Sequence, residues 1–352
     1  MIVSAIKKVV EKENLSQEEA QAVMEEVMSG KATEAQIGSL LTALRMKEET
    51  VEELTGFALA MRRKAEPVVC RTLVDSGMSG TGRELLVDTC GTGGDASGTF
   101  NVSTATAFTV AGCGLRVAKH GNRSFTSLCG SADVLEALGV KISLEPSLIG
   151  KCIDEIGIGF LFAPNLHLAM KYVMPSRRQL AIRTVFNILG PLTNPAGAQA
   201  QVIGVYDGNV TEKMALALGK LGTEHAFVVH GADGLDEISN TGESKISEIR
   251  AGILRTYHIK PEEFNIPRCQ LKDLAGGQVA ENAEIIKAIL KGEKGPKRDI
   301  VLLNAAAAIV AGNKAPDITQ AIKIAEDSLD SGKALTKLRA IVEFTNSLPS
   351  TQ

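Results

Sequence analysis

Two glycine-rich loops contain the residue types that could bind phosphate. The first loop, residues 91–99, follows the short apolar segment Leu85–Val87 and leads into residues 101–104, whose composition favours the start of a helix. Glycine lets backbone N–H groups approach anionic oxygens, and a helix N-terminus adds unpaired donors and the positive end of its dipole. This arrangement predicts a phosphate site between a strand and a helix. The hydroxyl groups that could add contacts belong to Thr99, Ser103 and Thr104.

The second loop, residues 119–127, supplies the positive charge that the first loop lacks. Between residues 96 and 132 the sequence has no Asp or Glu, but it has Arg116, Lys119 and Arg123. An interval with cations alone favours a polyanionic ligand. We therefore expect the two loops to hold the phosphates of an activated sugar.

Other interpretations of these loops fit less well. The pattern Gly91-x-Gly93-x-x-Ala96 formally satisfies the dinucleotide fingerprint, but the acidic residue expected about 20 positions later would fall within the acid-free interval. The sequence has no G-x-x-x-x-G-K-[ST] motif. Glycines that serve only a tight turn would explain one loop, but not two loops with cations and hydroxyl groups.

Two adjacent carboxylates further along the chain could recruit a metal ion. Asp236 and Glu237 lie in a loop that follows the apolar segment Ala226–Val229. Mg²⁺ typically binds one or two carboxylates together with substrate phosphates and water. Such a pair taken alone is more often a solvated turn, but the two phosphate loops upstream favour a metal site.

An arginine and two histidines are candidates for binding a second substrate. Arg177 follows residues 160–167 in a helical stretch, and its guanidinium could bind a carboxylate through two parallel hydrogen bonds. Its position fits a surface charge equally well. His120 and His167 could be ordinary loop-anchoring residues, since neither has an evident Asp or Ser partner that would indicate a catalytic triad.

The elements that must position these residues fall into two parts. Residues 1–68 are predicted to be helical, because capping-box patterns recur and apolar residues repeat at helical spacing. This apolar face could build a core or a contact between two copies of the chain. The capping pairs are Ser16/Glu19, Thr33/Gln36 and Thr50/Glu53, and the apolar face comprises Ile37, Leu40, Leu41 and Leu44.

Residues 69–352 are predicted to form a larger α/β domain around a mostly parallel sheet. Short apolar runs alternate with helical segments there, which favours parallel strands with helices on both faces of the sheet. The expected strands are 85–87, 115–117, 202–205 and 226–229, and the expected helices are 103–111, 131–138, 211–221, 301–311, 318–328 and 335–344.

Composition restricts the class of protein. The chain has 352 residues, 38 Lys and Arg against 41 Asp and Glu, and a net charge of −3, which argues against a nucleic-acid partner. Its six cysteines form no C-x-x-C pair, and we expect reduced thiols in a cytoplasmic protein. The longest apolar run, Ala305 to Gly312, is shorter than the ~20 residues of a membrane helix, so no membrane partner is expected.

Taken in order, these segments closely resemble the anthranilate phosphoribosyltransferase family over nearly the whole chain. The segments that carry the resemblance are GTGGD at 91–95, NVST at 101–104, KHGNRS at 119–124, GSADVLEALGV at 130–140, RTVFNILGPLTNPA at 183–196 and GLDE at 234–237. The resemblance implies a nucleoside-phosphorylase-like fold, in which helices from about 164–190 rejoin the helical domain. A homodimer is expected from the apolar face of the helical region, which a second copy of the chain could cover.

The resemblance further implies roles for individual residues. Those implied to bind 5-phosphoribosyl 1-diphosphate are Gly91, Gly94, Asp95, Thr99, Asn101, Val102, Ser103, Thr104, Lys119, His120, Gly121, Asn122, Arg123, Ser124, Phe125, Thr126, Ser127 and Ser131. Those implied to contact anthranilate are Gly91, Asn122 and Arg177, with His120 and His167 beside its approach. Ser103, Asp236 and Glu237 are implied to bind Mg²⁺, and Lys119, Asn122 and Arg177 to act in catalysis.

The implied reaction moves the phosphoribosyl group from diphosphate to the amino nitrogen of anthranilate, a step of tryptophan biosynthesis. The alternative is a pyrimidine nucleoside phosphorylase, which would use inorganic phosphate and would not need the Asp236–Glu237 pair to bind a metal. Another alternative, a nucleic-acid-binding module, would require a basic surface.

Three positions depart from the family pattern. Leu168 occupies a position where proline is usual, Leu128 one where a basic residue is common, and Cys129 one where serine is frequent. None of these changes removes an implied metal or diphosphate ligand. They bear on how the second loop closes and on the shape of the anthranilate side of the site.

Overall fold

The computed structural model describes residues 1–70, 85–95, 97–124 and 128–348. Four helices begin the chain, and three of them start where the capping patterns predict. In each of these, the N-cap hydroxyl accepts a hydrogen bond from the backbone N–H of the third helical residue. The side chain of that third residue in turn accepts a hydrogen bond from the backbone N–H of the N-cap residue. The helices are α1 (Ile2–Val10), α2 (Gln17–Met28), α3 (Glu34–Lys47) and α4 (Val51–Lys64).

A buried carboxylate joins the loops between these helices. Glu53 accepts hydrogen bonds from the N–H of Leu15 at 2.9 Å and of Thr50 at 2.8 Å. Its other partner is the Lys47 Nζ, at 2.9 Å, so the buried negative charge has a cation beside it. Together these bonds fix the ends of α2, α3 and α4 relative to one another.

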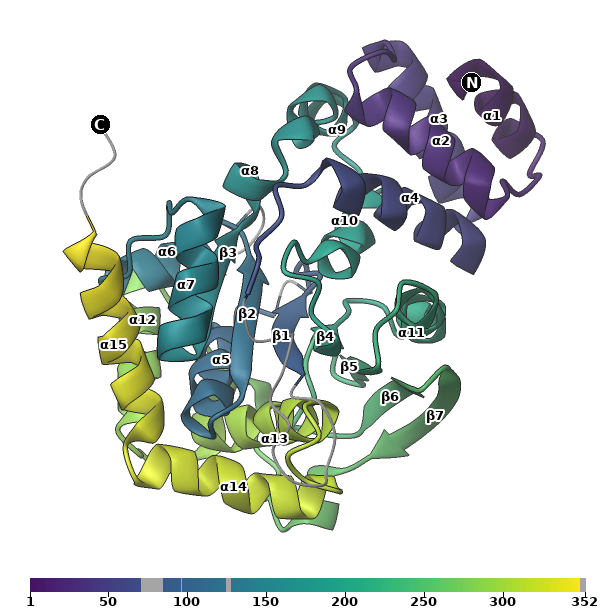
Figure 1. Cartoon of the computed structure of the whole chain (residues 1–352). Helices are drawn as coiled ribbons and strands as arrows, with labels where there is room; N and C mark the ends of the chain where they lie inside the picture. Colours follow the sequence, from purple (N-terminus) through teal and green to yellow (C-terminus); the bar gives the residue numbers. More distant parts are fainter. Residues whose placement is uncertain (71–84, 96, 125–127, 349–352) are drawn as a thin grey trace.

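A seven-stranded sheet forms the centre of the larger part of the molecule (Figure 1). Its order is β3-β2-β1-β4-β5-β6-β7, parallel from β3 to β5 and antiparallel from there to β7. The four predicted strands are confirmed as parts of β1, β2, β4 and β5. The bounds are β1 (Leu86–Gly91), β2 (Arg116–Gly121), β3 (Ile158–Phe162), β4 (Ala200–Gly204), β5 (His225–Gly231), β6 (Ser244–Arg250) and β7 (Ile253–Ile259).

Three strands were not predicted from the sequence. β3 is wholly buried but only 5 residues long, and it leads directly into a helix. β6 and β7 pair as an antiparallel hairpin at the edge of the sheet, and most side chains of β7 are exposed. Edge strands of this kind carry many polar residues, so their sequence lacks the apolar run of a buried strand.

Helices cover both faces of the sheet, as predicted for a mostly parallel sheet. Val87 and Val117 belong to the same core as α5 and α13, whereas Leu86 and Ala118 pack with α7 on the opposite face. The remaining helices continue these two layers or cover the ends of the sheet (Figure 1). The bounds are α5 (Val102–Gly112), α6 (Ser131–Ala137), α7 (Pro146–Ile156), α8 (Ala163–Leu166), α9 (Met174–Leu180), α10 (Phe186–Leu189), α11 (Thr211–Lys220), α12 (Val279–Leu290), α13 (Pro296–Ala311), α14 (Ile318–Asp330) and α15 (Lys333–Ser347).

A segment from the middle of the chain packs against the first helices. α9 lies beside α3, where Ser176 Oγ donates to the carbonyl of Glu34 at 3.2 Å and Gln179 Nε2 donates to the Glu34 carboxylate at 3.0 Å. This is the region expected to rejoin the helical part. The division into 1–68 and 69–352 stays a prediction.

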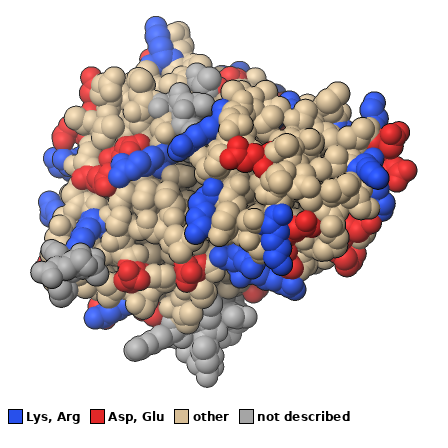
Figure 2. Space-filling model, turned by 90° about the horizontal axis from the view of Figure 1, so that it is seen from above, with Lys and Arg blue, Asp and Glu red and all other residues tan. Residues whose placement is uncertain are grey.

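The surface carries both signs of charge. Figure 2 shows Lys and Arg side chains interspersed with Asp and Glu side chains on the face seen from above. Among the helices of the described residues, none has the length and apolar character required to cross a membrane. The six cysteines all lie among the described residues, where no disulfide joins them, and four of them are buried.

Candidate functional site

The candidate site lies where the strand order reverses. β1 and β4 are neighbours, and the chain runs outward from this pair to β2 and β3 on one side and to β5 on the other. Parallel strands bring their carboxyl ends to one edge, and a crevice at the point of reversal is the usual ligand site of such sheets. Gly91, Gly121, Gly204 and Gly231 end β1, β2, β4 and β5 at this edge.

The first loop is tied to the predicted metal-binding carboxylate. The N–H of Gly93 donates to Asp236 Oδ2 at 3.0 Å. A Cβ on Gly91 would lie 2.6 Å from the same oxygen, so this position requires glycine. Gly94 has a φ of +80°, a conformation that L side chains rarely adopt. Close packing against Asp236 and the turn itself thus both require glycines here.

The start of α5 faces the same loop with unsatisfied groups. The N-cap residue Asn101 makes no capping hydrogen bond with its side chain. Its Oδ1 and the Oγ1 of Thr104 are buried and have no hydrogen-bond partner. Because buried polar atoms are normally bonded, these two oxygens are candidates for contact with a ligand or water. The buried side chain of Val102 leaves only its backbone for such a contact.

A buried lysine connects the two loops to α5. Lys119 is 3% exposed, and its Nζ donates to the carbonyl of Thr89 at 2.6 Å and to Ser103 Oγ at 3.2 Å. Burial lowers the pKa of Lys119, and the charges of Asp88 and Glu237 oppose this effect. The structure therefore places the Lys119 cation beside Ser103 and within the field of the acidic pair.

The two predicted metal ligands are neighbours in the chain and are half-buried. Removal from water, and after it the nearby charge of Asp95, raise the pKa of Asp236 to about 7. The pKa of Glu237 is also raised, by burial first and then by Asp236. Half-buried carboxylates without a full set of countercharges suit a hard divalent cation.

The residues present fit Mg²⁺ if a substrate completes its shell. Within the described part of the chain, no group of three or more His, Cys, Asp or Glu side chains is arranged as a complete metal site. Mg²⁺ commonly keeps several waters and uses one or two carboxylates plus phosphate oxygens. Asp236, Glu237 and the Ser103 hydroxyl supply the kind of oxygen donors that such a site requires.

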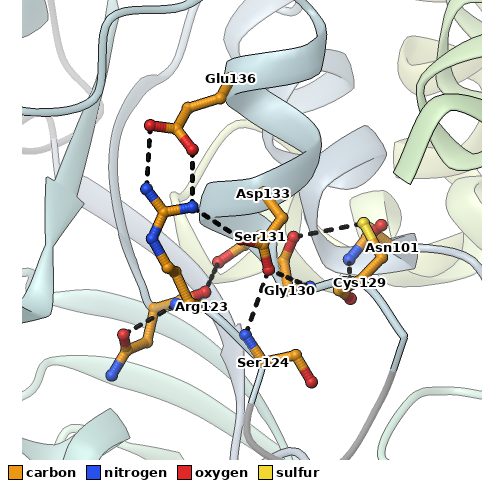
Figure 3. A network of polar contacts seen from close by, with 9 residues as sticks. Asn101, Arg123, Ser124, Cys129, Gly130, Ser131, Asp133 and Glu136 are labelled. Atoms are coloured by element: carbon orange, nitrogen blue, oxygen red, sulfur yellow. Dashed lines mark hydrogen bonds and ion pairs between the residues drawn. The ribbon is translucent and has the colours of Figure 1, made fainter. Parts of the chain in front are cut away.

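The second loop is held at the N-terminus of α6 (Figure 3). Arg123 forms hydrogen bonds with Asp133 at 2.8 Å and with Glu136 at 2.6 and 3.0 Å. Asp133 also accepts the N–H groups of Gly130 at 2.9 Å and of Ser124 at 3.3 Å. The acid-free interval ends immediately before Asp133, so the positive field that the sequence predicted is partly neutralised by the first acids of α6.

Of the remaining predicted residues in and after the second loop, some lie in the described part of the chain and three do not. Ser131 Oγ donates to the carbonyl of Asn122 at 3.2 Å, which fixes the loop where it returns to α6. A Cβ on Gly121 would lie 2.3 Å from the same Oγ. Phe125, Thr126 and Ser127 lie outside the described residues.

The two candidate histidines meet each other. The Nε2 atoms of His120 and His167 are 3.3 Å apart, in a buried position behind the ends of β2 and β3. Burial lowers the pKa of His120 to about 3 and that of His167 to about 4. Both imidazoles are therefore neutral near pH 7, and one can donate to the other.

Asp88 is a buried site residue that the sequence did not reveal. Its Oδ1 accepts the backbone N–H of His120 at 3.1 Å, and its Oδ2 accepts Asn194 Nδ2 at 2.8 Å. It comes directly after the expected strand 85–87, so a carboxylate at that strand end gave the one available signal. Its role is to join β1, β2 and the segment around Asn194.

Two arginines near α9 have different surroundings. Arg177 lies over the ring of Phe186, 5.5 Å from its centre, and burial lowers its pKa. Arg183 reaches further, and its Nη2 donates to the carbonyl of Gly94 in the first loop. The structure thus brings Arg183, which was not predicted, to the phosphate loop. Its place at the head of the 183–196 segment was the signal that could have revealed it.

The positions that depart from the family pattern lie at the rim of the site. Leu128 is 68% exposed and Leu168 is 53% exposed, which is unusual for large apolar side chains. Cys129 is buried, and its carbonyl accepts Asn101 Nδ2 at 3.0 Å. The loop backbone at residue 129 therefore contacts the start of α5.

We predict that Gly204→Ala destabilises the protein. A Cβ at this position would lie 1.5 Å from the carbonyl oxygen of Asp236, so the metal-site loop would have to move. We expect the free energy of unfolding in urea to fall by about 1–3 kcal/mol. Gly242→Ala is the control, because its Cβ would meet no atom within 4 Å. An equal effect in both variants would contradict the prediction.

We also predict that the histidine pair makes stability depend on pH. The folded-state pKa values of His120 and His167, about 3 and about 4, lie below the usual ~6.5. The unfolded chain therefore binds more protons between pH 6.5 and 4, and this part of the stability, complete above pH 6.5, is lost as the pH falls.

The measurement is urea unfolding of wild type and His167→Asn at pH 7.5 and pH 5. The stability difference between the two proteins should narrow at pH 5, because the variant has one buried histidine fewer to protonate. A constant difference for His167→Asn would be evidence against the prediction.

Family models match both parts of the chain. Residues 3–65 match the helical bundle domain of a glycosyl transferase family, and residues 83–335 match its a/b domain. Among curated relatives, anthranilate phosphoribosyltransferase of Pelotomaculum thermopropionicum is 55% identical over 348 residues, covering 99% of this chain and 98% of the relative. The enzyme of the same name from Moorella thermoacetica is 52% identical and covers 99% of both chains.

Solved structures agree with the sequence comparison. The crystal structure of anthranilate phosphoribosyltransferase from Thermus thermophilus matches with a TM-score of 0.89 and 42% identity, over 97% of this chain and 99% of that one. The Saccharomyces cerevisiae enzyme in complex with PRPP and Mg matches with a TM-score of 0.85 and 29% identity, over 99% and 98%. The phosphorylase alternative finds no support in these relatives. The chain belongs to the anthranilate phosphoribosyltransferase family.

Proposed function

We propose that the chain transfers the phosphoribosyl group of 5-phosphoribosyl 1-diphosphate to the amino nitrogen of anthranilate, giving N-(5-phosphoribosyl)anthranilate and diphosphate. The observation that carries the proposal is the meeting of both glycine loops with the half-buried Asp236–Glu237 pair at one edge of the sheet. The names of the full-length relatives support the identity of both substrates.

The donor substrate would occupy the two loops and the start of α5. Backbone N–H groups of the first loop and the hydroxyl groups of Thr99, Ser103 and Thr104 suit phosphate oxygens. Lys119 already touches Ser103 and would face the leaving diphosphate. Asp236, Glu237 and Ser103 would hold Mg²⁺, which when bound neutralises charge on the diphosphate.

The acceptor would bind on the side of the site formed by α9 and the second loop. Arg177 would pair with the anthranilate carboxylate, in a partly buried position that strengthens such a pair. Gly91 and Asn122 would position the amine at the end of β1 and in the second loop. The neutral His120–His167 pair would line the approach without adding charge.

The reaction itself demands positioning more than proton transfer. The bond between the sugar carbon and the diphosphate oxygen breaks, and a bond to the amine nitrogen forms with its lone pair. An aryl amine is unprotonated at neutral pH, so a strong general base is not needed, and the proton released can pass to solvent. Holding amine and sugar carbon at attack distance is then the principal task of the protein.

We predict that the purified protein consumes anthranilate only when 5-phosphoribosyl 1-diphosphate and Mg²⁺ are both present. Loss of anthranilate fluorescence measures the reaction directly. Asp236→Ala/Glu237→Ala should lower kcat/KM by about a hundredfold or more, because charge on the leaving group is no longer neutralised. Glu293→Ala, at an exposed site beyond α12, is the control. No fluorescence loss in the wild type would refute the proposed reaction.

The helical part of the chain supports a homodimer. A groove of about 630 Å³ runs between α1, α3 and α9, lined in part by Val10, Gly38, Met46 and Leu180. Met46 is 77% exposed and Val10 is 59% exposed, although both are apolar. Gly38 and its small neighbours on α3 would let a second helix approach closely. A second copy of the chain, expected from the apolar face of this region, would cover these residues.

We predict a dimer at micromolar concentration, measured by sedimentation equilibrium or light scattering. Met46→Glu should shift the population toward monomer, because it places charge in the covered groove. Ile253→Glu is the matched control, since Ile253 is 63% exposed on β7, away from the groove. A monomeric wild type would rule out the dimer.

A cytoplasmic location completes the proposal. No disulfide joins the six cysteines, all of which lie in the described part of the chain, as is usual in a reducing compartment. Both substrates are small phosphorylated or carboxylated molecules of biosynthesis, which are made inside cells.

A further inference from the structure

Arg183 connects two segments that are far apart in the sequence. It lies between α9 and α10, in an exposed position, and its Nη2 donates to the carbonyl of Gly94. Its guanidinium also lies over the ring of Tyr206, with the central carbon 4.0 Å from the ring centre. That distance is within the range of a cation–π contact. The side chain is therefore held from two sides.

Tyr206 is itself fixed to the first loop. It follows the end of β4, and its N–H donates to Thr92 Oγ1 at 3.2 Å. The N–H of Thr92 in turn donates to the carbonyl of Gly204 at 2.8 Å. Tyr206, Arg183 and the loop residues Thr92 and Gly94 thus form a closed ring of contacts, which we name the loop clamp.

The hydrogen bond from Arg183 to the Gly94 carbonyl determines the direction of the next backbone N–H, which could donate to a phosphate oxygen. A trans peptide unit is planar, and its C=O and N–H point in opposite directions. A fixed Gly94 carbonyl therefore fixes the N–H of Asp95, the next residue of the loop. Gly94, at φ +80°, has no Cβ to resist rotation of this peptide, so an outside partner is needed to hold one orientation.

We propose that Arg183 is a positioning residue for the donor substrate, holding the Gly94–Asp95 peptide so that its N–H faces the phosphates, while the Tyr206 ring holds Arg183. This inference rests on the proposed function, since the phosphates are those of 5-phosphoribosyl 1-diphosphate. Arg183 acts through the loop and does not touch the substrate.

The clamp also joins the two halves of the reaction. Arg183 lies six positions after Arg177, just beyond α9, whereas Gly94 belongs to the donor loop. The helix α9 carries Arg177, which is proposed to bind anthranilate. The chain after α9 leads directly to Arg183, which holds the loop of the donor substrate. Since α9 packs on α3, a movement of the first helices would be transmitted through α9 and Arg183 to Gly94.

The test measures binding of 5-phosphoribosyl 1-diphosphate with Mg²⁺ to the full chain by titration calorimetry, without anthranilate. Arg183→Gln and Tyr206→Leu should each raise the Kd, by about ten- to hundredfold for Arg183→Gln, because a hydrogen bond from a charged donor is lost. The double variant should bind no more weakly than Arg183→Gln alone, since both changes remove the same clamp.

Conservative variants separate positioning from general damage. Tyr206→Phe keeps the ring and should bind like wild type, and Arg183→Lys should restore part of the affinity because an ammonium can still reach the carbonyl and the ring. Arg178→Gln, at the neighbouring exposed arginine of α9, is the control. In turnover, kcat at saturating donor should change far less than the KM for the donor.

Each contrary outcome has a distinct meaning. An unchanged Kd for Arg183→Gln would overturn the clamp. Losses that add in the double variant would overturn it as well, because they would mean that Arg183 contacts the substrate independently of Tyr206. A wild type that does not bind 5-phosphoribosyl 1-diphosphate would instead refute the proposed function, and with it this inference.

Discussion

The structure depends on the burial of opposite charges at the point where the sheet reverses its strand order. Asp236 and Glu237 are half-buried beside the first loop, and Lys119 is fully buried beside Ser103. Removing such groups from water is costly unless other charges and hydrogen bonds replace the solvent. The replacements visible in the chain are backbone N–H groups and Lys119. A phosphorylated substrate with Mg²⁺ would supply the remaining charges and hydrogen bonds. Binding of the substrate would therefore stabilise the acidic pair in its place.

Close packing then fixes where these charges lie. Gly91 and Gly204 both abut Asp236, so neither position has room for a side chain. The loop after β5 is thereby pressed onto the ends of β1 and β4. Across the site, Asp88 joins β1 to β2 and to Asn194. These contacts fix the two glycine loops where they leave the strands. Arg123 and Arg183 hold the outer parts of the loops through their charged side chains.

The region of α8 to α10 gives the two parts of the molecule a common border. α9 contacts α3 through Ser176 and Gln179, and Arg183 just beyond it reaches Gly94. The helix α9 therefore lines the groove that a second copy would cover, and it also carries Arg177, which is proposed to bind anthranilate. Arg177 lies on α9, and Arg183 lies in the short connection that leads from α9 to α10.

Local sequence was sufficient for much of this description. The capping boxes located α2, α3 and α4, because each depends on two side chains three residues apart. Glycine spacing after an apolar run located the first loop, and the adjacent acids after another run led to the prediction of a metal site, which stays a prediction. Motifs in the order of a known family identified the fold and the reaction, since residues that hold phosphates keep a fixed spacing along the chain.

Only the tertiary structure decided which of these residues meet. The edge hairpin β6–β7 was missed because polar residues are tolerated on an exposed edge. Arg123 is paired with Asp133 and Glu136 because α6 turns its first acids back onto the loop. The His120–His167 contact spans 47 positions and the Arg183–Gly94 contact spans 89. Contacts at such separations depend on strand order and helix packing, which no local pattern specifies.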